Sequence, residues 1–132
     1  EKVADIAAWL TARRANTLVL TALDSVAWTL NIRGSDVSHT PVALAYAVVH
    51  ADARVELFIT PEKADAALRA HMGAAVTVRP RADFARALEM EFTGKTVAVD
   101  PERAVVAIFA ALEAGGATID AVRDPVVLAK AL

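Results

Sequence analysis

The sequence is poor in several features that would point to particular chemistries. It has no cysteine, which excludes disulfides, thiolate metal sites and a cysteine nucleophile and is consistent with a reducing compartment. It has no long apolar run, since the longest, Val42–Val49, falls far short of the roughly 20 residues of a membrane helix. It has no basic excess either, because 14 Lys and Arg stand against 16 Asp and Glu. These absences favour a soluble cytoplasmic protein that binds neither nucleic acid nor membrane.

Apolar residues are abundant in the chain. They make up 56% of 132 residues, which calls for an extensive core and fits one domain spanning residues 1–132. The sequence begins at Glu1 inside a helical pattern and stops at Leu132 inside another. We therefore expect it to be a piece excised from a larger chain.

Hydrophobic periodicity alternates between strand and helix along the sequence. A short turn at Asp52 between two strand-like runs predicts an antiparallel hairpin, and Asp24 with Ser25 offers an N-cap for a helical turn through Trp28. The predicted strands are Thr17–Thr21, Val42–Ala51, Ala53–Thr60, Ala75–Val78, Thr96–Val99 and Thr118–Val122. The predicted helices are Lys2–Arg14, Pro61–Met72, Pro80–Phe92, one from Pro101 to the Gly115–Gly116 pair, and one after Pro125. The pattern predicts an α/β fold in which a mixed sheet carries helices on both faces.

No complete active site is visible in the sequence. The histidines His39, His50 and His71 lack partners at the spacing of zinc sites, and we interpret His50 and His71 as residues that end a strand and a helix. No serine has the setting of a nucleophile elbow, and no glycine-rich turn could cradle a phosphate. We expect no catalytic or metal-ligating residue here.

One segment, between residues 21 and 41, stands out because its part from Asn31 to Thr40 is polar and breaks all periodicity. It brings Trp28, Arg33, Asp36 and His39 within a dozen residues, which suits recognition of a polar ligand or docking of another domain. A structural interpretation is also open, in which Arg33 pairs with Asp36 and Trp28 fills the core.

Four stretches of the sequence resemble one family. The stretch Leu18–Pro41 is similar to a long signature of the three-domain X-prolyl aminopeptidases, although Thr29 replaces a usual aliphatic residue and Ser38 a frequent proline. Shorter similarities follow in the same order at Val55–Ile59, Gly94–Pro101 and Asp124–Leu132.

The resemblance implies the second, non-catalytic module of such an enzyme, a creatinase/prolidase N-terminal-type domain with ribonuclease-H-like topology. It also implies a separate catalytic domain of pita-bread fold, absent from residues 1–132, that would hold two divalent metal ions, typically manganese, through two Asp, one His and two Glu. No position of this sequence is assigned to those ligands. The implied partners are that catalytic domain and X-Pro peptides, and the implied full-length enzyme is a homodimer.

Two functions follow as hypotheses. In the first, the chain is a non-catalytic domain of a metallopeptidase that hydrolyses X-Pro bonds, and it shapes substrate access and domain assembly through Trp28, Arg33, Asp36 and His39. In the second, it is a stand-alone interaction or small-ligand-binding module without peptidase activity.

Overall fold

A computed structural model describes residues 2–21, 23–30, 45–60, 76–101, 104, 106–123 and 125–126. Within helix α2 the side chains of residues 23, 24, 27 and 28 are not described. The elements, in chain order, are α1 (Lys2–Ala12), β1 (Thr17–Leu20), α2 (Leu23–Leu30), β2 (Tyr46–His50), β3 (Val55–Ile59), β4 (Val76–Pro80), the 3-10 turn η3 (Arg81–Asp83), α4 (Phe84–Met90), β5 (Thr96–Val99), α5 (Val106–Ala114) and β6 (Thr118–Ala121).

The described strands form one mixed sheet in the order β4-β3-β2-β1-β5-β6. Strand β2 runs antiparallel to both β1 and β3, which confirms the predicted hairpin. The pairs β3–β4, β1–β5 and β5–β6 are parallel. Short β-branched and aliphatic sequences build these strands, as expected for strands whose two faces are both covered.

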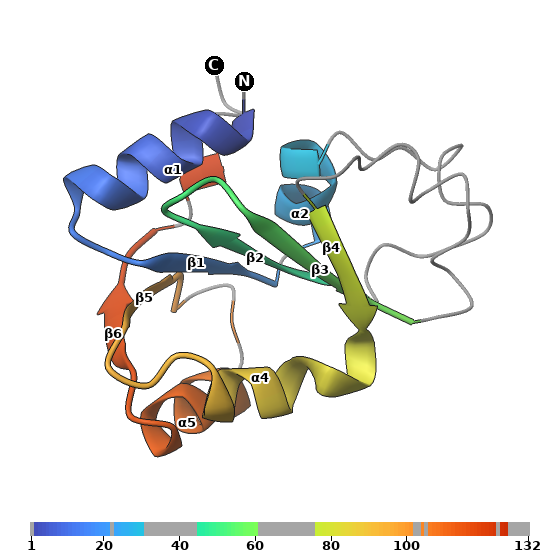
Figure 1. Cartoon of the computed structure of the whole chain (residues 1–132), viewed down its shortest axis with the longest axis vertical. Coiled ribbons are helices and arrows are strands. Elements are labelled where there is room, and N and C mark those ends of the chain that lie inside the picture. Colours follow the sequence, from blue (N-terminus) through green and yellow to red (C-terminus); the bar gives the residue numbers. More distant parts are fainter. Residues whose placement is uncertain are drawn as a thin grey trace.

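Helices lie on both faces of the sheet, with α1 and α2 on one side and α4 and α5 on the other (Figure 1). Alternate strand residues feed two separate cores, because successive side chains point to opposite faces. In β1, for example, Leu18 and Leu20 pack under α1, whereas Val19 packs with Phe84 and Leu88 of α4. The predicted class, a mixed α/β sheet with helices on both faces, is confirmed.

The structure corrects several local predictions. The helix predicted over Pro80–Phe92 is shorter, since Pro80 ends β4, Arg81–Asp83 form η3 and α4 runs only from Phe84 to Met90. The helix predicted from Pro101 begins at Val106.

A cap was also misplaced. Asp24 and Ser25 do not cap a helical turn but lie inside α2, which begins at Leu23. The buried residues of α2 recur at helical spacing: Ser25, Val26, Thr29 and Leu30. The segment therefore forms a helix that packs one side against the core. The predicted helix Pro61–Met72 and the helix after Pro125, apart from residues 125–126, lie outside the described residues.

Two glycines explain how α4 and α5 are joined to the sheet. Gly94 has φ +76° in the turn between α4 and β5, a conformation that suits glycine. A Cβ at Gly115, after α5, would clash with the backbone carbonyl of Glu89, so the end of α5 approaches α4 directly. The sequence predicted a stop at both positions; α5 ends at Ala114, directly before Gly115, whereas α4 ends at Met90, four residues before Gly94.

Candidate functional site

A line of polar contacts crosses the α4 face of the sheet from β1 to β4. The Thr17 hydroxyl lies 3.3 Å from Nδ1 of His50, and Nε2 of His50 lies 2.7 Å from a carboxylate oxygen of Glu56. The other Glu56 oxygen accepts a 2.8 Å hydrogen bond from Nη1 of Arg79. Each residue comes from a different one of the four adjacent strands, so side-chain bonds reinforce the backbone ladder.

Strand register explains why these side chains meet. In the β2–β3 hairpin Glu56 stands opposite Val48, so His50, two residues further along β2, shares its face and lies diagonally across from it. In the parallel pair β3–β4, Arg79 stands opposite Phe58, two residues beyond Glu56 on that same face. The alternation of side chains along each strand therefore places His50, Glu56 and Arg79 on the same face of the sheet.

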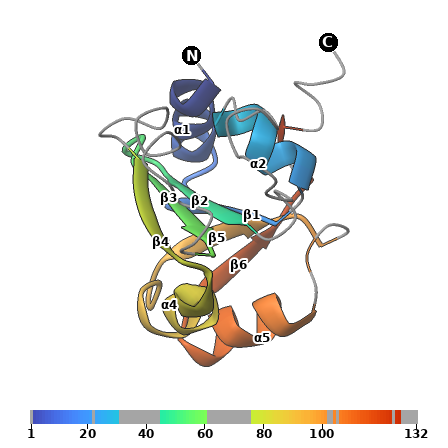
Figure 2. The same cartoon turned by 90° about the vertical axis from the view of Figure 1, so that its right-hand side faces the viewer.

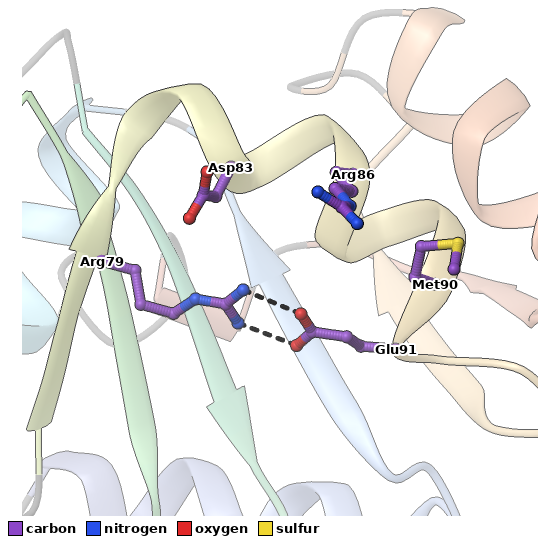
Figure 3. Close-up of a pocket in the computed structure, with 5 residues that line it drawn as sticks. All are labelled: Arg79, Asp83, Arg86, Met90 and Glu91. Atoms are coloured by element: carbon purple, nitrogen blue, oxygen red, sulfur yellow. Dashed lines mark hydrogen bonds and ion pairs between the residues drawn. The ribbon is translucent and has the colours of Figure 1, made fainter.

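Arg79 extends the line of contacts to the end of helix α4. Its Nη1 and Nη2 donate two hydrogen bonds of 2.8 Å to the carboxylate of Glu91, which follows the last residue of α4 (Figure 3). Its guanidinium also lies 4.8 Å from the centre of the Phe58 ring. We call Thr17, His50, Glu56, Arg79 and Glu91 the polar network; it ties four strands to one helix.

The ionisation of the polar network follows from its hydrogen bonds. The bond from His50 lowers the pKa of Glu56 to about 2, helped by Arg79, although partial burial opposes the shift. Because ionised Glu56 can only accept, Nε2 of His50 carries the proton, and in the neutral ring Nδ1 then accepts from Thr17. The bonds to Glu91 and then Glu56 raise the pKa of Arg79.

The chemistry open to the polar network is limited by this pairing. Both oxygens of Glu56 are engaged and its pKa lies far below neutrality, so it is a poor proton acceptor for general base catalysis. Among the described residues no group of three or more His, Asp or Glu side chains could hold a metal ion. The arrangement suits a rigid scaffold.

Two hollows open beside the ends of the polar network. One, of about 330 Å³, is lined by Arg79, Asp83, Arg86, Met90 and Glu91 (Figure 3). Its lining carries two arginines and two carboxylates, and Arg79 is already bound to Glu91. The other, of about 220 Å³, is lined by Asn16, Thr17, His50, Ala51, Asp52, Arg54 and Lys95. There Arg54 is paired with Asp52, and Lys95 adds one further positive charge.

Most of the site residues predicted from sequence lie outside the described part of the structure. Trp28 lies on α2, but its side chain is not described, and Arg33, Asp36 and His39 lie outside the described residues, as does His71. His50 does end a strand as predicted, yet it also anchors the polar network. Sequence reasoning missed Glu56 and Arg79. The period of two in the hairpin was a usable signal for the His50–Glu56 pair.

Comparison with known proteins places the whole chain in one group. The family described as Creatinase/Prolidase N-terminal domain matches residues 1–132. A probable Xaa-Pro aminopeptidase P from Laccaria bicolor is 36% identical over the full chain, which spans 21% of that protein. A second, from Talaromyces marneffei, is 36% identical over 61% of the chain and 12% of that protein. The chain therefore spans about a fifth or less of these curated relatives.

Solved structures share the fold. The X-prolyl aminopeptidase of Caenorhabditis elegans, described as a cytosolic enzyme with a di-nuclear active site, superposes with a TM-score of 0.76 at 30% identity, over 98% of this chain and 22% of that one. The N-terminal domain of a Lactobacillus brevis Xaa-Pro dipeptidase gives a TM-score of 0.66 at 15% identity and is covered over its full length. The second match shows that a domain of this fold can be prepared and solved by itself.

Proposed function

The chain belongs to the Creatinase/Prolidase N-terminal domain family, and from this membership we propose that it is a non-catalytic domain of an enzyme that hydrolyses X-Pro peptide bonds. The single observation that carries the proposal is the 36% identity to a probable Xaa-Pro aminopeptidase P along the whole chain. Its role is to shape substrate access and to contact the catalytic domain of the same protein.

The described site supports a scaffolding role. The carboxylates of the polar network are held by His50 and Arg79, and neither network carboxylate is left for proton transfer or metal binding. The proposal assigns the chemistry to a catalytic domain with two divalent metal ions, manganese in our expectation, which would supply a metal-bound hydroxide as nucleophile. None of the described residues is assigned to these ions.

The segment that contains Arg33, Asp36 and His39 is proposed as the surface that meets substrate or a catalytic loop, together with Trp28. Replacing Arg33 by alanine in the full-length enzyme should lower kcat/KM about tenfold or more, equivalent to about 1.4 kcal/mol, because a lost guanidinium contact weakens transition-state binding. Steady-state hydrolysis of an X-Pro peptide measures this, with Arg86→Ala on α4 as the matched control. An unchanged kcat/KM with a lower Tm would assign Arg33 to structure instead.

Location and assembly are further parts of the proposal. We place the protein in the cytoplasm, supported by the cytosolic relative from C. elegans. Separately, no helix among the described residues is long and apolar enough to cross a membrane. We also propose a homodimer of the full-length enzyme, which sedimentation equilibrium would check. A monomer mass at micromolar concentration would argue against it.

The second hypothesis, a stand-alone interaction or ligand-binding module, is not favoured by the similarity to X-Pro peptidases. It predicts that the gene encodes no catalytic domain with two Asp, one His and two Glu metal ligands. Reading the open reading frame beyond Leu132 decides between the two, since the peptidase proposal fails without such a domain.

A further inference from the structure

A hollow of about 320 Å³ lies between helices α4 and α5, on the side of the sheet opposite α1. Its lining includes Tyr46 of β2 and Arg81 of η3, with Ala85 and Leu88 from α4 and Ala107 and Ala111 from α5. The two helices run beside each other below the sheet in both views (Figures 1 and 2). Most of the lining is apolar, and the volume lies at the lower end of small-molecule sites.

The two arginines beside the aromatic cluster differ in one respect. Tyr46 stacks on Phe84 with ring centres 4.2 Å apart, and Phe84 meets Phe58 edge-on at 5.2 Å. Arg79 lies over Phe58 and Arg81 lies over Tyr46, 4.8 and 5.1 Å from the ring centres. Arg79 has two carboxylate partners. Arg81 forms no ion pair with any residue in the described part of the chain.

Arg81 has unused hydrogen-bonding capacity. Its Nη2 donates to the Tyr46 hydroxyl at 3.0 Å, whereas its Nε is buried and finds no acceptor among the described residues. A buried donor left unbonded costs about 1–3 kcal/mol, so the fold keeps this group under-satisfied. Because the Tyr46 oxygen accepts from Arg81, its own proton remains available for another acceptor.

We propose that the α4–α5 hollow binds a small monocarboxylate with an apolar body. The guanidinium of Arg81 and the hydroxyl of Tyr46 receive the carboxylate, and the alanine and leucine side chains contact the apolar part. A single cation suits a monoanion better than a phosphate dianion, since Arg81 is the only charged residue that lines the hollow in the described structure. The site is separate from the polar network and independent of the proposed peptidase function.

The carboxylate can come from a free acid or from the carboxyl terminus of a peptide. Titration of the 132-residue chain, followed by amide NMR shifts, tests both sources with octanoate and with N-acetyl-alanyl-leucine. Octan-1-ol and the peptide amide are the matched ligands without a carboxylate, and acetate lacks the apolar body. We expect saturable shifts around Tyr46, Arg81 and Ala107 with at least one of the two acids, and at least tenfold weaker binding of its uncharged analogue and of acetate.

Three variants connect the binding to the hollow. Arg81→Gln should weaken binding of the acid at least tenfold without changing the response to octanol, and Ala107→Leu, at an exposed helix position, should block the hollow while the fold is kept. Arg86→Gln, which does not line this hollow, should bind as the wild type does. The proposal is overturned if neither acid saturates, if each acid binds no better than its uncharged analogue, or if folded Arg81→Gln binds the acid normally.

Discussion

Glu56 joins two strands of the sheet through its two carboxylate oxygens. One oxygen meets His50 and the other meets Arg79, and only 15% of the Glu56 side chain is exposed. Removing one member of such a pair leaves its partners with unmet hydrogen bonds inside the α4 core. The residue is therefore expected to stabilise the fold through its charge as well as its shape.

Glu56→Gln should lower the free energy of unfolding at pH 7 by about 2–3 kcal/mol, because the amide keeps the shape but loses the charge that binds His50 and Arg79. Glu91 is more exposed and forms a surface ion pair, so Glu91→Gln should lower the free energy of unfolding by about 1 kcal/mol or less. Urea unfolding of both variants and the wild type measures the difference. Equal losses would contradict the central position of Glu56.

The Glu56 contribution also depends on pH in a defined direction. Its pKa is about 2 in the folded chain and 4.5 ordinarily, so the folded state favours the ionised form. The resulting stability, on the order of 3 kcal/mol, is complete above pH 4.5 and declines as pH falls towards 2. The difference between wild type and Glu56→Gln should shrink over that window. A difference that stays constant from pH 6 to pH 2 would refute the assigned ionisation.

At the residue level, the sequence predicted less of the site than of the fold. His50 was correctly placed at a strand end, and hairpin alternation could have placed Glu56 beside it. The contact of Arg79 with Glu56 could not be predicted, because the strand of Arg79 was predicted to stop at Val78. In addition, the β3–β4 pairing joins strands that are distant in the sequence. Nothing in local periodicity reports a parallel pairing of that kind.

Most helices and strands were predictable from hydrophobic periodicity and from the positions of glycine and proline. Strand β5 has the predicted bounds, and Phe84 and Leu88 of α4 point inward as expected. The order of the strands was not predictable, since it depends on which nonlocal pairings bury the most surface. The cap assigned to Asp24 was wrong because α2 begins at Leu23, before Asp24, and its buried residues from Ser25 to Leu30 follow helical spacing.

The contact between α4 and α5 gives a prediction at this scale. Gly115→Ala should destabilise the chain by about 1–3 kcal/mol, because its Cβ would overlap the Glu89 carbonyl and push α5 from α4. Gly94→Ala should cost about 1 kcal/mol from its positive φ alone, since nothing lies within 4 Å of the added atom. Thermal unfolding compares the two. Asparagine at residue 94 should recover part of the loss, whereas asparagine at residue 115 should not.

On the scale of the whole molecule, the sheet and its two helical layers form a scaffold in which several of the described ionised groups form ion pairs. Arg13 at the end of α1 binds Asp120 of β6 through two hydrogen bonds, and Arg54 binds Asp52 in the hairpin turn. This pattern and the family membership both support a domain that positions other parts of a protein. The chain spans only 21% of the L. bicolor relative, so the proposed chemistry is assigned elsewhere.

The most direct test is hydrolysis of a peptide with proline in second position, assayed with manganese for the full-length protein and for residues 1–132 separately. We predict release of the amino-terminal residue by the full-length protein and none by the 132-residue chain. Metal-dependent turnover by the 132-residue chain, or a full-length protein that leaves the X-Pro bond intact, would contradict the account.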